Sequence, residues 1–157
     1  MSTHAPAPIS HNPRAHNLKV AIVTARWNGH ITSELHRGAL SRLIEAGVPA
    51  HNITSVQVPG AVELVNAAAH LVNTRAYHAV IIFGCVIQGD TPHFDYVCQS
   101  VTQGVTTLNT LGTTPVIFGL LTVLTEAQAT DRIGGAHGHK GREAADAAIE
   151  MATLWSN

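Results

Sequence analysis

The sequence predicts a single α/β domain of 157 residues in which helices cover both faces of a four-stranded parallel sheet. Apolar runs alternate along the chain with segments in which apolar residues recur at helical spacing, which is typical of βαβ units. The apolar runs are continuous, as in parallel strands that are buried on both faces. Right-handed crossovers then place the helices in two outer layers, so we expect a three-layer αβα sandwich.

Breaks in these patterns set the expected boundaries. Residues 1–17 lack periodicity and are rich in Pro and His, so they are expected to form a flexible arm, or an edge strand for a neighbouring chain, before a domain at 18–157. The expected strands cover residues 18–25, 53–58, 79–86 and 115–123. The expected helices cover residues 31–44, 61–73 and 94–109, a short segment from Thr125, and a segment that ends near Trp155. Breaks lie at Gly47 and Pro49, at Pro59-Gly60 and in a glycine-rich turn at 134–141. This order of elements is flavodoxin-like.

Composition limits the classes of partner. The net charge is -1, only 12% of residues are charged, and no Lys/Arg cluster is present, so we expect no nucleic-acid partner. So low a charged fraction indicates that other subunits cover part of the surface, and we expect a homo-oligomer. No apolar run reaches the roughly 18 residues of a membrane span, and no signal pattern begins the chain, so we expect a cytoplasmic protein without a membrane partner.

The cysteines and histidines do not predict a metal site or a disulfide. Cys85 and Cys98 form neither a disulfide framework nor a zinc motif, and we expect both to be core thiols. His93, His137 and His139 lack a carboxylate or cysteine at ligand spacing, so no metal is expected.

The segment Gly84–Val97 is the first candidate for chemistry. An apolar strand leads into a cluster of turn-forming residues, and His93 stands where a helical pattern begins. Ligands of parallel α/β proteins bind beyond the carboxyl ends of the strands. Histidine is the side chain best suited to proton transfer near neutral pH. His93 is therefore a candidate for proton transfer, and a plain helix-starting residue on a polar loop is the alternative.

Trp27 and Glu63 follow the first and second expected strands, so they are expected at the same edge of the sheet. The indole of Trp27 offers a flat face for a planar heterocycle, or it caps the surface. Glu63 can bind a ligand, or it can simply favour the start of a helix through the helix dipole.

A glycine-rich segment between Arg132 and Lys140 is a candidate anion site. Two permanent cations beside exposed backbone N–H groups near a helix start are suited to a phosphate or a carboxylate. The spacing of a Walker A loop is absent, and no Gly-x-Gly-x-x-Gly follows the first strand, so neither a P-loop nor a dinucleotide fold is supported.

Together these motifs resemble the lumazine synthase family from Leu18 to the last helix. Each motif alone is weakly specific, whereas their order along the chain is highly specific. The segments that carry the resemblance are Ala25–Asn28, Val58–Leu64, Gly84–Val97, Phe118–Val123, Glu126–Ala129 and His139–Gly141.

The resemblance implies a reaction and a site. The family condenses 5-amino-6-(D-ribitylamino)uracil with 3,4-dihydroxy-2-butanone 4-phosphate, and releases 6,7-dimethyl-8-ribityllumazine, phosphate and water without a metal or organic cofactor. The catalytic residues would be His93 for proton transfer, with Arg132 and Lys140 at the phosphate. The substrate-binding residues would be Trp27, Ala61, Val62, Glu63, Cys85, Val86, Ile87, Asp90, Thr91, Phe118 and Arg132.

The resemblance also implies an assembly. Family members are pentamers, stacked decamers or icosahedral shells, and all are built on a pentamer with active sites between neighbouring chains. Phe118 would close the pocket of the adjacent subunit. The chain therefore predicts a homo-oligomer built on pentamers, with two small-molecule substrates.

Four positions depart from the family pattern. Val62 stands where relatives often have a large aromatic residue, and His137 and His139 stand where other residues are commoner. Asp90 replaces a small residue beside the expected phosphate, which it would repel unless it turns away or pairs with Arg132 or Lys140.

Two other classes of protein share parts of this pattern. A lumazine- or flavin-binding paralogue without turnover would keep the fold, and Asp90 favours it, whereas His93, Arg132 and Lys140 favour the enzyme. A receiver-type signalling domain shares the order of layers, but it needs an acidic pair where this chain has Arg26-Trp27.

Overall fold

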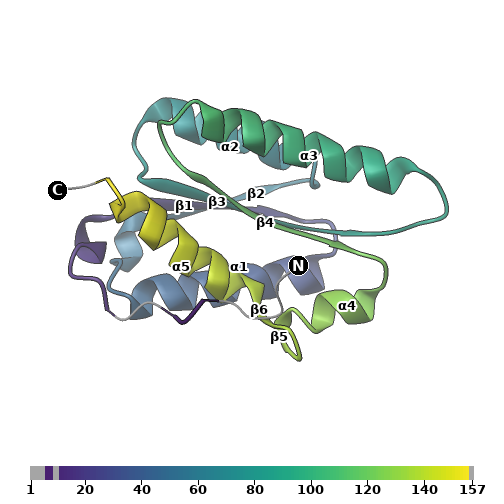
Figure 1. Cartoon of the computed structure of the whole chain (residues 1–157), viewed down its shortest axis with the longest axis horizontal. Coiled ribbons are helices and arrows are strands. Elements are labelled where there is room, and N and C mark those ends of the chain that lie inside the picture. The colour runs from purple at the N-terminus through teal and green to yellow at the C-terminus, as the bar shows by residue number, and fades with distance from the viewer. Residues whose placement is uncertain (1–5, 9–10, 156–157) are drawn as a thin grey trace.

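The computed structural model describes residues 6–8 and 11–155 and shows a parallel sheet between two layers of helices (Figure 1). The sheet has four strands in the order β2-β1-β3-β4, and all neighbours are parallel. The strands are β1 (Val20–Ala25), β2 (Ile53–Val58), β3 (Ala79–Ile87) and β4 (Val116–Val123). The fold class predicted from the sequence is confirmed.

The main helices cover the two faces of the sheet in pairs (Figure 1). One face packs against α1 (Gly29–Glu45) and α5 (Lys140–Thr153), and the other packs against α2 (Glu63–Thr74) and α3 (His93–Thr110). Figure 1 draws a short helix and a hairpin on the same side as α1 and α5. The remaining elements are η1 (Ala15–Asn17), η2 (Ala50–Asn52), α4 (Glu126–Thr130), β5 (Ile133–Gly135) and β6 (Gly138–His139).

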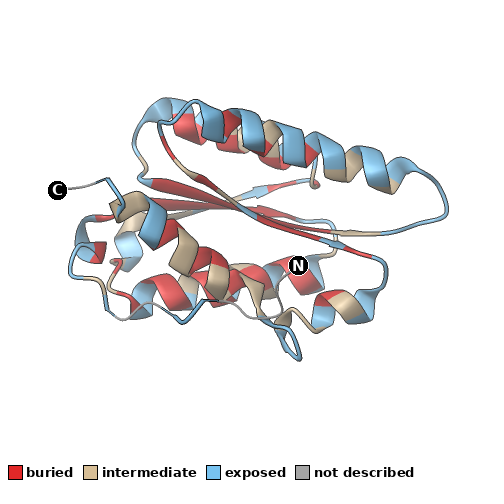
Figure 2. Ribbon diagram, viewed as in Figure 1, coloured by how far each residue is buried: buried red, intermediate tan, exposed pale blue. Residues whose placement is uncertain are grey.

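Each face of the sheet has its own apolar core, because side chains alternate along a strand. Val20 and Ile22 of β1 belong to the core beneath α1 and α5, whereas Ala21 and Val23 belong to the core beneath α2 and α3. Figure 2 shows buried residues through the sheet and on the inward sides of the helices. This two-sided burial explains why the strands are continuous apolar runs.

The residues before β1 include a short helix, whereas the sequence predicts a flexible arm there. Ala15–Asn17 forms the 3-10 helix η1, and the Ala15 side chain is fully buried in the core on the α1 and α5 face. None of the described residues of the arm lies in a strand. Residues 1–5 and 9–10, which also belong to the predicted arm, lie outside the described part of the chain.

The glycine-rich segment also differs from the sequence expectation, because it forms an antiparallel hairpin and not a simple turn. Ile133 pairs with His139 across it, and Gly135 pairs with Gly138. Gly134 and Gly138 adopt φ values of 109° and 75°, a region in which residues with a Cβ are strained. The glycines therefore allow the chain to reverse between α4 and α5.

The carboxyl ends of the strands form one edge of the sheet. Short backbone hydrogen bonds join the loops at this edge, from the Arg26 N–H to the Val58 carbonyl (2.9 Å) and from the Gln88 N–H to the Val123 carbonyl (2.9 Å). The chain after β1 is therefore held to the end of β2, and the chain after β3 is held to the end of β4. No helix in the described chain is long and apolar enough to cross a membrane.

Candidate active site

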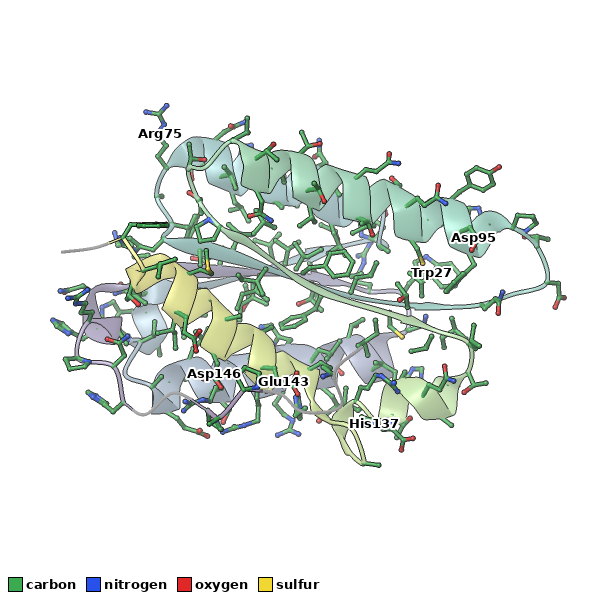
Figure 3. All side chains as sticks on the ribbon, viewed as in Figure 1. Trp27, Arg75, Asp95, His137, Glu143 and Asp146 are labelled. Carbon is green, nitrogen blue, oxygen red and sulfur yellow. The ribbon has the colours of Figure 1, made fainter. Side chains whose placement is uncertain are left out.

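Trp27 leaves the carboxyl end of β1 with most of its side chain in solvent. The residue is 73% exposed, and its backbone N–H donates to the Pro59 carbonyl at 3.2 Å. A Cβ placed on Gly60 would lie 3.2 Å from Cδ1 of Trp27, so one edge of the indole packs against this glycine. Figure 3 draws Trp27 at the same end of the molecule as Asp95 in the first turn of α3. The indole is therefore held at one edge, and the rest of its surface is exposed.

Asn28 joins two strand ends, a role that the sequence pattern does not predict. Its backbone is left-handed (φ 54°), and its side-chain Nδ2 donates to the Cys85 carbonyl at 2.8 Å. This bond ties the loop after β1 to the end of β3. Asparagine directly after a strand was the available signal, because Asn tolerates left-handed conformations better than most residues.

Glu63 begins α2 and binds the turn that precedes it. Its Oε2 accepts a hydrogen bond from the Gly60 N–H at 2.9 Å. A carboxylate at this position also favours the helix start, so the structural explanation applies to this side chain, and ligand binding by Glu63 stays a prediction. Ala61 and Val62 form the turn before the helix, and Val62 is 46% exposed.

The end of β3 contributes a buried thiol and two half-buried aliphatic residues. Cys85 is buried, while Val86 and Ile87 are partly exposed at the edge of the sheet. Burial, with a smaller effect of the negative charge of Glu126, raises the pKa of the Cys85 thiol to about 11. The thiol is neutral at physiological pH and is a packing group, as expected, so its backbone carbonyl is the polar part of this residue. Burial also raises the pKa of Cys98.

The loop from β3 to α3 presents His93 to solvent. His93 is the first residue of α3 and is exposed, and its backbone N–H donates to Thr91 Oγ1 at 3.4 Å. Asp90 and Thr91 precede it and are also exposed. The position is a helix start, as the alternative reading proposed, and the imidazole is accessible to a substrate at the carboxyl edge of the sheet.

Arg132 and Lys140 are brought together by the hairpin. The Lys140 N–H donates to the Arg132 carbonyl at 2.8 Å. Arg132 Nη1 donates to the Gln128 carbonyl at 2.7 Å, which occupies only one of the five guanidinium donors. Lys140 Nζ pairs with Glu143 at 2.7 Å. Within the described residues, Asp90 forms no ion pair with either cation.

The hairpin lies on the other side of the sheet from His93. Figure 1 places β5 and β6 beside α1 and α5, whereas α3, which begins at His93, covers the opposite face. His137, labelled in Figure 3, marks the hairpin below the sheet. One chain therefore presents the predicted proton-transfer residue and the predicted phosphate cations on different faces.

Phe118 lies apart from both groups. It is 43% exposed in β4 and lines a groove of about 550 Å³ with residues of α3. It lies five positions before the last residue of β4, so at about 3.3 Å per residue it is about 16 Å from the carboxyl edge. The groove residues on α3 are Thr102, Val105, Thr106, Asn109 and Thr110.

Within the described chain no group of three or more His, Cys, Asp or Glu residues could hold a metal.

Comparison with known proteins gives the family. A family model described as 6,7-dimethyl-8-ribityllumazine synthase matches residues 17–156. The chain belongs to this family. The membership confirms the resemblance that the ordered motifs predicted.

Curated relatives with that description match most of the chain. The protein from Porphyromonas gingivalis is 52% identical over 142 residues, which cover 90% of this chain and 88% of the relative. The protein from Parabacteroides distasonis is 50% identical over 139 residues, which cover 88% and 87%. The protein from Bacteroides fragilis is 49% identical over 140 residues, which cover 88% and 98%. All three are described as 6,7-dimethyl-8-ribityllumazine synthases.

Proposed function

We propose that this protein is an enzyme of riboflavin biosynthesis, a transferase that condenses 5-amino-6-(D-ribitylamino)uracil with 3,4-dihydroxy-2-butanone 4-phosphate. The products are 6,7-dimethyl-8-ribityllumazine, phosphate and water. The observation that carries the proposal is the convergence of Trp27, Glu63 and the end of β3 at one edge of the sheet, in a chain of this family.

The pyrimidine substrate binds at the edge formed by β1, β2 and β3. Trp27 stacks on the heterocycle, because its indole is exposed and held along one edge by Gly60. The turn that contains Ala61, Val62 and Glu63 holds the ribityl chain, partly through backbone groups. Cys85, Val86 and Ile87 bind the edge of the pyrimidine, with polar contacts from the backbone, since the thiol of Cys85 is neutral and buried.

The phosphate of the second substrate binds between Asp90-Thr91 and the hairpin cations. Arg132 keeps donors for an anion, and Lys140 lies beside it. Asp90 repels the phosphate, because neither cation neutralises it within the described chain. His93 and these cations lie on different faces of one chain, which supports a pocket assembled from two subunits.

The chemistry consists of proton transfers around carbon–nitrogen bond formation. The amine attacks the ketone, a proton moves from nitrogen to oxygen, and the carbinolamine loses water to give an imine. Phosphate then leaves with the electrons of its C–O bond, and the resulting enol tautomerises to a ketone. The ribityl-bearing amine attacks this carbonyl, and the ring closes with loss of a second water. His93 exchanges these protons, and its exposed position at the start of α3 supports this role. Much of the acceleration comes from orientation, because the two reactants are held together.

The assembly is a homo-oligomer built on pentamers. The exposed apolar residue Phe118, far from the carboxyl edge of its own chain, supports a pocket shared between neighbours. The partners are the two small-molecule substrates, and we expect neither a nucleic-acid nor a membrane partner. We expect the enzyme in the cytoplasm.

A steady-state assay with both substrates tests the proposal. His93→Ala should lower turnover by roughly 10- to 1000-fold without abolishing it, because orientation survives the loss of one proton-transfer group. Arg132→Ala should instead raise the KM for the butanone phosphate and leave the KM for the pyrimidine nearly unchanged. Tight binding of product or flavin without turnover would identify the non-catalytic paralogue instead.

A further inference from the structure

His139 holds the hairpin against the rest of the domain. It is the last residue of β6 and the N-cap of α5, and its Nδ1 accepts a hydrogen bond from the Arg142 N–H at 3.4 Å. An acceptor at this place satisfies a backbone donor that the helix leaves unpaired. The ring nitrogen that accepts must lack a proton, so the cap requires neutral imidazole with its proton on Nε2.

The imidazole fits a space left by two glycines. A Cβ on Gly38 of α1 would lie 2.1 Å from Cε1 of His139, and a Cβ on Gly141 of α5 would lie 3.0 Å from the same atom. The Nε2 atom is buried and has no hydrogen-bond partner among the described residues. The ring is therefore wedged between α1 and α5, and the proton on Nε2 has no acceptor among the described residues.

Charged groups surround the ring on both helices. Glu34, Arg37 and Arg42 come from α1, and Arg142, Glu143 and Asp146 come from α5. Most of these are already paired, Arg37 with Glu34, Arg42 with Asp146 and Arg142 with Glu45. β5 adds no titratable side chain at this contact, where Gly134 is the neighbour of the ring.

The same residue is joined directly to the predicted phosphate cations. His139 pairs with Ile133, which follows Arg132, and it precedes Lys140. The hydrogen bond from the Lys140 N–H to the Arg132 carbonyl lies next to it in the hairpin. A shift of the ring therefore moves the backbone of both cations.

We propose that neutral His139 is the positioning residue of the Arg132–Lys140 hairpin, and that its protonation loosens this hairpin and weakens binding of the phosphate group. The consequence for the reaction rests on the proposed function. Protonation converts the Nδ1 acceptor into a donor that faces the Arg142 N–H, so the cap is lost, and it adds a positive charge at the positive end of the helix dipole.

The electrostatics agree with this geometry. Burial lowers the pKa of His139, with smaller effects of Arg37 and Arg142. Because folding lowers the pKa of His139, the residue contributes stability that is fully present above its pKa in the unfolded chain, near 6.5. This stability is lost as the pH falls through the pKa of His139 in the folded protein. The loosening is therefore an acid-side effect.

The test compares wild type with His139→Asn, because an Asn oxygen can cap the helix and does not titrate. Between about pH 7.5 and about pH 5.5, the dissociation constant of inorganic phosphate and the KM of the butanone phosphate should rise about three- to tenfold more in wild type than in the variant. The second ionisation of the phosphate ester, at pH ~6, and the second ionisation of inorganic phosphate affect both proteins equally. The KM of the pyrimidine should not show this difference.

Two further variants make the test specific. His139→Ala lacks the acceptor and should bind phosphate weakly at both pH values. His137→Asn, on an exposed residue of the same hairpin, should keep the wild-type profile. Equal pH dependence in wild type and His139→Asn overturns the proposal, as does wild-type phosphate binding by His139→Ala. If the wild type makes no lumazine, the proposed function fails, and calorimetric phosphate binding still decides the role of His139.

Discussion

Asn28 and Arg75 are the two described residues other than glycine with a left-handed backbone (Figure 3 labels Arg75). Replacing each by glycine separates the effect of backbone strain on stability from the effect of the Asn28 side chain on substrate binding. Asn28→Gly keeps the backbone conformation and removes the bond to Cys85. It should raise the KM of the pyrimidine about three- to tenfold, because one hydrogen bond of roughly 1 kcal/mol no longer holds the Trp27 loop. The measurement is the pair of KM values.

Arg75→Gly is the matched control for Asn28→Gly. Arg75 caps the carboxyl end of α2 with φ 55°, far along the chain from the loop after β1. Glycine there should raise the free energy of unfolding by about 0.5–1 kcal/mol without changing either KM. An Asn28→Gly enzyme with a wild-type KM for the pyrimidine would mean that the bond only stabilises the fold.

The raised pKa of Cys85 leads to a prediction about the stability of the folded protein at high pH. Its pKa is raised to about 11, so the neutral thiol stabilises the folded state below its ordinary pKa, and this stability is lost as the pH rises through the folded value. Wild type should therefore lose more stability than Cys85→Ala between about pH 9 and about pH 11. Urea unfolding at several pH values measures this, and parallel curves would show that Cys85 does not titrate as stated.

At the residue scale, the sequence was informative wherever a side chain follows a strand. Trp27, Glu63 and His93 were predicted at the carboxyl edge because parallel strands bring their ends together. The roles of Asn28 and His139 were not predicted. Each depends on a partner distant in the sequence, the Cys85 carbonyl in one case and the space above Gly38 in the other, and no local pattern encodes such contacts.

At the element scale, the contact of α1 with α5 depends on Gly38. A Cβ there would overlap the imidazole of His139. Gly38→Ala should therefore lower the free energy of unfolding by about 1–3 kcal/mol, although alanine alone would favour a helix by about 1 kcal/mol. Thermal unfolding measures the sign directly.

Gly29→Ala is the control for Gly38→Ala in the same helix. A Cβ on Gly29 meets nothing within 4 Å, so the substitution should be neutral or slightly stabilising. If Gly38→Ala were also neutral, the ring of His139 would have room to move aside, and the close packing of the hairpin on α1 would not hold.

The sequence predicts the boundary of an element correctly where a residue pair such as Pro-Gly breaks the strand or helix. Strand β2 ends at Val58, immediately before Pro59-Gly60, as predicted. Helix α2 begins at Glu63, two residues later than predicted, because the bond between Glu63 and the Gly60 N–H encloses Ala61 and Val62 in a turn. Glycine frequency in the segment 134–141 predicted a turn but not the pairing of β5 with β6, which depends on backbone geometry.

At the scale of the whole molecule, Phe118 and His93 occupy places that one chain does not bring together. Phe118 lies about 16 Å from the carboxyl edge along β4, while His93 begins α3 at that edge. In a ring of identical chains every interface pairs one surface of a subunit with a different surface of the next. In such a ring we predict a pocket that combines His93 from one chain with Phe118 from its neighbour.

Subunit mixing tests this arrangement. His93→Ala and Phe118→Asp chains, each nearly inactive alone, should regain activity when they are unfolded and refolded together. Random mixing in equal amounts leaves about one interface in four with both residues intact, so activity should approach about a quarter of wild type. Each variant refolded alone sets the baseline, and native mass spectrometry of tagged chains confirms mixed oligomers. Mixed oligomers no more active than this baseline would place His93 and Phe118 in the pocket of a single chain.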